Sequence, residues 1–127
     1  MTDDTNLLQK VFDQANYRAI FENQREKLIE VLKASLIYSY NGGFFQVGPA
    51  FFYELSMYID EGKTEVVLLD INYNLVEIDD INEFLFEVKS VYFEAINTYK
   101  IEIERLKKTR YIPTITRLYE LDDDVES

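Results

Sequence analysis

The stretch that decides the fold is NGGFFQVGPAFFYEL, residues 41–55, which gathers four phenylalanines and a tyrosine around two glycine-containing breaks. Residues 41–43 (NGG) predict the end of a preceding helix, because glycine adopts the left-handed C-terminal cap without a Cβ penalty. Residues 44–47 (FFQV) predict a short strand, and the Gly-Pro pair at 48–49 predicts the start of a second helix, since proline suits the first helical position. A core of this size needs large apolar side chains, so we expect these aromatic residues in the core. A ligand or partner pocket is the alternative.

The segment before this stretch predicts an amphipathic helix. Residues 5–40 contain neither glycine nor proline, and their apolar residues recur at helical spacing with one gap at Gln24. The helix is either continuous or divided into two near Asn16. The apolar stripe consists of Leu8, Val11, Phe12, Ala15, Ile20, Phe21, Leu28, Val31, Leu32, Ser35 and Leu36.

The segment after it predicts a helix, a hairpin and a longer helix. The helix that begins at 49 ends at Gly62, and EVVLLD (65–70) and LVEI (75–78) form a hairpin around the turn-prone residues INYN. Asp80 and Glu83 make a capping box that opens a last helix, from about Ile81 to about Arg110. The second helix buries Phe51, Phe52, Leu55, Tyr58 and Ile59. The last helix has a coiled-coil-like seam of Ile81, Leu85, Val88, Tyr92, Ala95, Tyr99, Ile103 and Leu106.

This element order, α–β–α–β–β–α, predicts an α+β fold. We expect a small three-stranded antiparallel sheet, in which residues 44–47 lie beside the hairpin and long helices pack on the sheet. One domain over residues 1–119, with the N-terminal helical part at 5–40, would be followed by an acidic tail at 120–127.

Composition excludes several classes of function. The 127 residues include no cysteine and no histidine, so disulfides, thiolate chemistry, most hydrolytic triads and most zinc sites are excluded, and no enzyme is expected. The net charge of −11 argues against binding to nucleic acid or to an anionic membrane, because both need a basic surface. The N-terminus, MTDDTNLLQK, lacks the apolar region of a secretory signal. The expected location is the inside of a cell or a particle.

A carboxylate group around the hairpin invites a metal hypothesis. Residues 70–74 (DINYN) match the first, third and fifth positions of a calcium-binding EF-hand loop, but Leu75 stands where the loop needs glycine and Ile81 where it needs glutamate. Turn and cap chemistry explains these residues more simply, so no metal or cofactor is expected. The carboxylates are Asp70, Glu77, Asp79, Asp80 and Glu83.

The end of the last helix and the segment after it carry the expected partner contacts. A basic cluster there complements the helix dipole or binds an acidic partner, including residues 54–87 of a second copy in a head-to-tail oligomer. The tail LYELDDDVES is either a docking peptide or a solvated end. The interface candidates are Tyr92, Tyr99, Arg105, Lys107, Lys108, Arg110, Arg117, Leu118 and Tyr119.

Residues 42–110 also carry a resemblance in their order of elements. A Gly-Gly strand, a proline-headed helix, a hairpin ending in Glu-x-Asp-Asp and a long helix ending in Lys-Lys resemble small uncharacterised proteins from the structural-gene region of contractile-tailed phages of marine cyanobacteria. The resemblance implies a virion component or an assembly factor whose partners are head, neck or tail proteins, with no catalytic residues to transfer. The rival hypothesis is an acidic phage-encoded regulator that inhibits a nucleic-acid enzyme.

Overall fold

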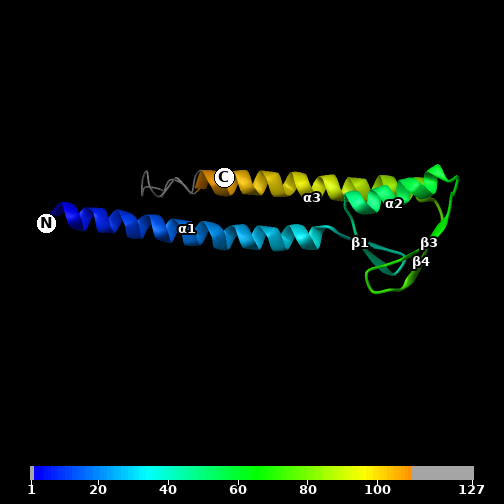
Figure 1. Ribbon diagram of the computed structural model, residues 1–127, viewed down its shortest axis with the longest axis horizontal. Coiled ribbons are helices and arrows are strands. Elements are labelled where there is room, and N and C mark those ends of the chain that lie inside the picture. Colours follow the sequence, from blue (N-terminus) through cyan, green and yellow to red (C-terminus); the bar gives the residue numbers. More distant parts are fainter. Residues whose placement is uncertain (1, 110–127) are drawn as a thin grey trace. The chain divides into compact units, whose positions relative to one another are not determined.

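The computed structural model describes residues 2–109, which form three helices and two separate two-stranded antiparallel sheets (Figure 1). The helices are α1 (Thr2–Ser35), α2 (Pro49–Asp60) and α3 (Ile81–Thr109). The strands are β1 (Ile37–Tyr40), β2 (Gly43–Gln46), β3 (Val66–Leu69) and β4 (Leu75–Ile78). The chain divides into one unit made of residues 30–98 and another made of the parts outside that range. The prediction of one domain over 1–119 stays a prediction, and the acidic tail at 120–127 lies outside the described residues.

The expected three-stranded sheet is wrong. The strand at 43–46 pairs with β1, in the register Tyr40↔Gly43 and Ile37↔Gln46, and β3 pairs with β4 alone. The residues taken as a helix cap are the turn of this first hairpin, since Asn41 and Gly42 have φ values of 46° and 81°. Two successive residues with positive φ fit the twist of a hairpin, for which Asn-Gly is a strong signal.

The other predicted elements agree with the structure. The helix α1 is continuous through Asn16 and ends at Ser35, five residues before the predicted end. The predicted element order is therefore wrong at this point, because residues 37–40 form the strand β1 in place of the last helical turn. The proline at the start of α2, the hairpin strands and the start of α3 lie where the pattern put them. The Oδ1 atom of Asp80 accepts a hydrogen bond of 3.1 Å from the Glu83 amide, as expected for the cap of α3.

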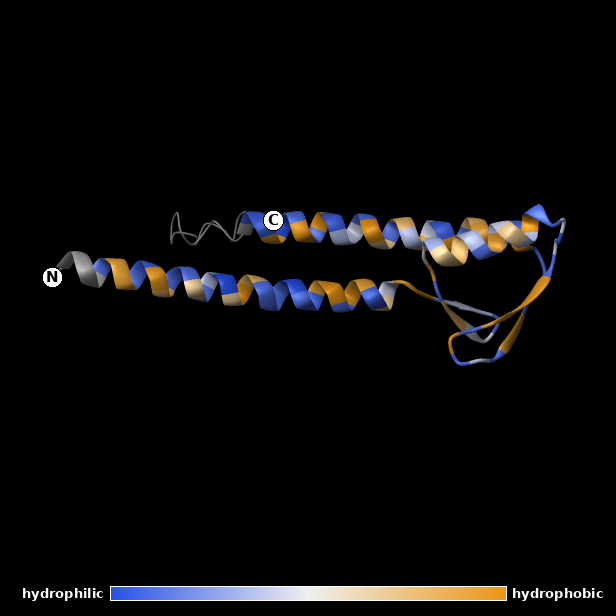
Figure 2. Cartoon of the chain, in the orientation of Figure 1, coloured by the Kyte–Doolittle hydropathy of each residue, from blue (hydrophilic) through white to orange (hydrophobic). Residues whose placement is uncertain are grey.

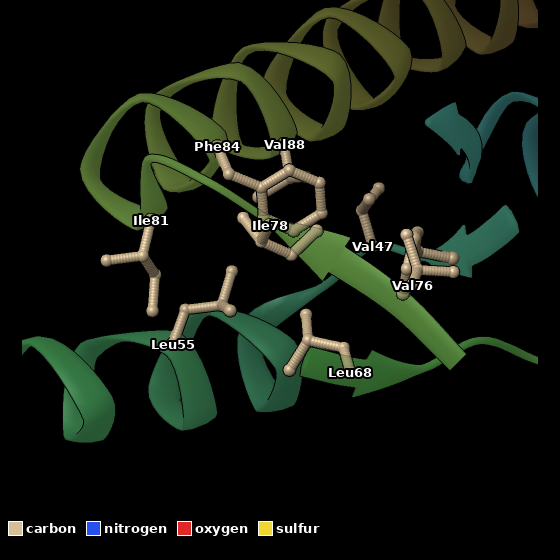
Figure 3. Close-up of a cluster of buried hydrophobic side chains, with 9 residues drawn as sticks. Val47, Leu55, Leu68, Val76, Ile78, Ile81, Phe84 and Val88 are labelled. Carbon is tan, nitrogen blue, oxygen red and sulfur yellow. The ribbon is translucent and has the colours of Figure 1, made fainter. Parts of the chain in front are cut away.

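The core belongs to the unit of residues 30–98, where α2, α3 and the inner faces of both hairpins supply it (Figure 3). Phe84 lies at its centre, in ring contact with Phe45 and Tyr40 at centroid distances of 5.5 and 5.0 Å. Burial of such side chains is the main stabilising term of the unit. The buried apolar residues are Phe45, Val47, Leu55, Leu68, Val76, Ile78, Ile81, Phe84 and Val88.

The aromatic stretch at 41–55 therefore divides between core and surface. Phe45 is buried, and Phe51 and Phe52 are half-buried against the core. Phe44 and Tyr53, in contrast, expose 43% and 81% of their surface. The expectation of a core position holds for Phe45, while Phe44 faces outward because side chains alternate along a strand.

Candidate protein-interaction surface

The β3–β4 hairpin is mostly hydrophobic, as Figure 2 shows, and carries apolar residues on both faces. Only its inner face packs on the core. Leu68 and Val76 are cross-strand partners on the buried face. On the outer face Leu69 and Leu75 are partners, with exposed fractions of 57% and 74%. In an antiparallel sheet with one solvated face, that face normally carries polar residues. The outer face of this hairpin instead has the composition expected of a covered surface.

Four more exposed apolar side chains belong to the hairpin or to the strand that is hydrogen-bonded to its turn. Phe44 is tied to the turn of the hairpin, because the Ile71 amide donates a hydrogen bond of 2.9 Å to the Phe44 carbonyl oxygen. We call the following set the hairpin surface: Phe44, Val67, Leu69, Ile71, Tyr73 and Leu75.

The turn that presents this surface is organised by the buried carboxylate of Asp70. Its Oδ1 atom accepts hydrogen bonds from the Asn72 and Asn74 amides at 2.9 and 2.8 Å, and its Oδ2 atom accepts one from the Phe44 amide at 2.9 Å. These donors, the Phe44 amide foremost, lower the pKa of Asp70 below its usual range, although burial alone would raise it. Asp70 therefore fixes the turn and joins it to β2 in one arrangement.

Tyr73 occupies the most unusual position in this turn. Its φ of 64° lies in the left-handed region, and 81% of its surface is exposed. The Tyr73 amide donates to the Asp70 carbonyl oxygen at 3.0 Å, so the chain makes a tight turn that ends in a left-handed residue. Glycine or asparagine is usual at such a position in a hairpin loop, and a bulky residue there is strained. Strain of this kind is often associated with function.

Carboxylates flank the hairpin in the sequence. On its outer face Glu77 lies opposite Val67, and Glu65 directly precedes β3. Between residues 60 and 83, Lys63 is the one base among seven exposed acids, so the local potential is strongly negative. We call the following set the acidic rim: Asp60, Glu61, Glu65, Glu77, Asp79, Asp80 and Glu83.

Two carboxylates of the metal hypothesis are engaged in local structure. Asp70 binds backbone amides and Asp80 caps α3. In the part of the chain that the structure describes, no three acidic side chains converge in a geometry that could hold a metal ion.

The interface candidates that the structure describes are spread along α3, and their role in binding stays a prediction. Tyr92 is half-buried, and its ring contacts Phe52 at a centroid distance of 5.3 Å, so it belongs to the margin of the core. Tyr99 is half-buried on the later part of α3. Near the end of α3, Arg105 forms an ion pair of 2.8 Å with Glu102. Lys107 and Lys108 are exposed there, whereas Arg110, Arg117, Leu118 and Tyr119 lie outside the described residues.

The sequence did not predict the hairpin surface, because its residues were assigned only to strands and to the hairpin turn. The signal was the unbroken apolar run VVLL, residues 66–69, which is typical of a strand that is covered on both faces. Comparison with protein families, curated proteins and solved structures finds no match to the chain. Within residues 2–109, none of the helices combines the length and the apolar character that a membrane span needs.

Proposed function

We propose that this chain is a non-catalytic protein-interaction module, and that the hairpin surface is its principal docking site. The observation that carries the proposal is the outer face of β3–β4, where Val67, Leu69 and Leu75 each expose more than half of their surface in a well-packed unit. A contiguous apolar face on a protein that is otherwise highly charged is typical of a binding site.

The acidic rim indicates the chemistry of the partner. Along the outer face the hairpin is apolar at the turn, with Leu69 opposite Leu75, and acidic toward the other end, with Val67 opposite Glu77. A complementary partner would present a segment with apolar residues at one end and lysine or arginine at the other. Such pairing increases the association rate and fixes the register of the complex, while the apolar contact supplies most of the affinity.

The biological setting that we propose is the assembly or the structure of a phage particle. It rests on the order of elements in residues 42–110, which resembles small proteins encoded among phage structural genes. Head, neck or tail proteins would then be the partners, and the chain would be found in the virion or in the host cytoplasm.

The strongly negative surface also favours a second function. An acidic phage-encoded regulator could occupy the basic nucleic-acid channel of a host or phage enzyme, with the acidic rim in place of phosphates. The two functions differ in their salt dependence, since exposed charges are screened beyond about 10 Å at 0.1 M salt and apolar contacts are not.

Quantitative affinity purification from cells that naturally express the chain tests the proposal. The wild type is compared with a hairpin variant, Val67→Thr with Leu75→Thr, and with a control, Met57→Gln with Phe86→Gln, which alters exposed apolar residues outside the hairpin surface. The proposal predicts an identified capsid, neck or tail protein that the wild type and the control retain at high salt and the hairpin variant loses. Equal recovery by all three proteins would refute the hairpin surface. Recovery of a nucleic-acid enzyme at low salt only would favour the regulator.

A further inference from the structure

The apolar residues of α1 follow a repeat of seven residues. At 3.6 residues per turn this row of residues drifts around the helix between Leu8 and Leu32, whereas at 3.5 residues per turn it stays on one side as a seam, with Ile20 and Val31 outside it. Leu8, Val11 and Ala15 begin this seam, and Ile29 and Leu32 end it. A period of 3.5 is the signature of a left-handed coiled coil, in which each seam residue packs between residues of a second helix.

The seam is available for such a partner. Leu8 and Val11 expose 63% and 57% of their surface, Ala15 is exposed, and Ile29 and Leu32 are half-buried. A helix of 34 residues is about 51 Å long, and tertiary packing rather than intrinsic propensity supplies most of the stability of protein helices. The exposed part of the seam in α1 therefore predicts a further packing partner.

The centre of the seam identifies that partner through its charges. The seam positions between Ala15 and Ile29 are Arg18, Glu22 and Arg25. Two copies in parallel register would place each of these residues opposite its own copy, which gives three layers of like charges. A parallel pair of α1 helices is therefore unfavourable.

An antiparallel pair of α1 helices turns the same residues into complementary layers. In this arrangement the seam of the second helix runs in the opposite direction, so that the first seam residue of one helix faces the last of the other. Leu8 then meets Leu32 of the second copy, and Val11 meets Ile29. At the centre Arg18 meets Glu22, and two-fold symmetry repeats that ion pair. Arg25 lies opposite the small side chain of Ala15 and already contacts Glu22 of its own helix at 3.8 Å. Every central charge thus has an opposite charge within reach.

We propose that α1 is a self-association arm, which forms an antiparallel two-stranded coiled coil with α1 of a second copy. This inference does not rest on the hairpin surface, because it uses residues of α1 alone. The symmetric contact would give a module with two hairpin surfaces, and two linked sites bind a repetitive partner more tightly than one.

The mass of the full chain in solution, measured by light scattering across a concentration series, is the first test. The proposal predicts twice the chain mass of 15.1 kDa. Arg18→Glu should weaken the dimer at least tenfold, because it places like charges together in both central layers. Arg18→Glu combined with Glu22→Arg should restore it, since the exchanged pair is again complementary. Lys27→Glu is the matched control, with the same change of charge at an exposed position outside the seam.

Cross-linking tests the direction of the helices, since the chain has no cysteine of its own. The proposal predicts that Leu8→Cys mixed with Leu32→Cys gives a disulfide-linked dimer, and that Leu8→Cys alone does not. Monomers at all concentrations, as expected if another segment of the same chain covers the seam, would overturn the proposal. So would a dimer that is indifferent to Arg18→Glu, or one that Leu8→Cys cross-links by itself. None of these outcomes bears on the hairpin surface.

Discussion

Tyr73 offers a way to separate binding from stability, because its backbone is strained and its side chain is exposed. Its φ of 64° is a conformation that glycine adopts freely. A left-handed conformation costs a residue with a Cβ atom roughly 1–2 kcal/mol. Glycine gains flexibility in the unfolded chain, which offsets about 0.4–1 kcal/mol of that relief. Tyr73→Gly should therefore raise the free energy of unfolding by about 0.5–1 kcal/mol, the difference of these two terms.

The same change should weaken partner binding, because Tyr73 is the most exposed aromatic residue of the hairpin surface. Urea unfolding followed by circular dichroism measures the stability, and recovery of the partner in affinity purification measures the binding. Tyr73→Asn is the control, because asparagine tolerates the left-handed conformation and still has a polar side chain. A loss of stability on Tyr73→Gly would refute the argument from strain. Unchanged partner recovery would show that the exposed ring has no role in docking.

Three further predictions concern how the hairpins are held. A Cβ atom on Gly43 would lie 2.5 Å from Cγ2 of Val76, so Gly43→Ala should lower the free energy of unfolding by about 1–3 kcal/mol. In a Val76→Ala background this penalty should be smaller by at least about 1 kcal/mol. Additive losses of the two changes, measured by urea unfolding of both single variants and the double variant, would contradict the close packing. Asp70→Asn should lower the free energy of unfolding at neutral pH, because the lowered pKa of Asp70 stabilises the folded state above the unfolded pKa. The difference in stability from the wild type should shrink as pH falls below 3.8, since the folded state then becomes protonated at Asp70. A difference that stays constant in acid unfolding titrations would argue against this role. Burial and then the hydrogen bond to Glu87 raise the pKa of Tyr38 from 10.0 to about 12. The free energy of unfolding of the wild type should therefore fall between those pH values, and that of Tyr38→Phe should fall less. Equal slopes of stability against pH in the two proteins, followed by circular dichroism, would contradict this.

Local signals in the sequence predicted most helices and strands. Proline at position 49, the Asp80 cap and the turn-prone residues 71–74 each determine the backbone over a few residues, so the elements that they mark were correct. The first strand of the first hairpin and its turn were misassigned because Asn-Gly-Gly fits both a helix cap and a hairpin turn. The strand pattern of Ile37–Tyr40 would have distinguished them, since a tight hairpin needs a strand on each side.

The candidate site was less predictable than the fold. The run VVLL identified a strand, but whether a second apolar face is covered depends on residues far away in the sequence. Tyr92 was predicted as an interface residue but contributes to the margin of the core, whereas the exposed Tyr73 was not predicted as one. Residue type alone does not distinguish these positions, because tyrosine suits both a half-buried helix face and a binding surface.

Zero-length cross-linking of carboxylates to amines in the purified complex, followed by mass spectrometry, tests the central claim most directly. The account predicts links from Glu65 and Glu77, on the outer face of the hairpin, to lysines in one partner segment that also carries apolar residues, and loss of those links in the variant with Val67→Thr and Leu75→Thr. Links to Lys107 or Lys108 of a second copy would replace the proposed partner by the chain itself. Links confined to acids far from the hairpin, unchanged by the variant, would contradict the claim that this face is the docking site.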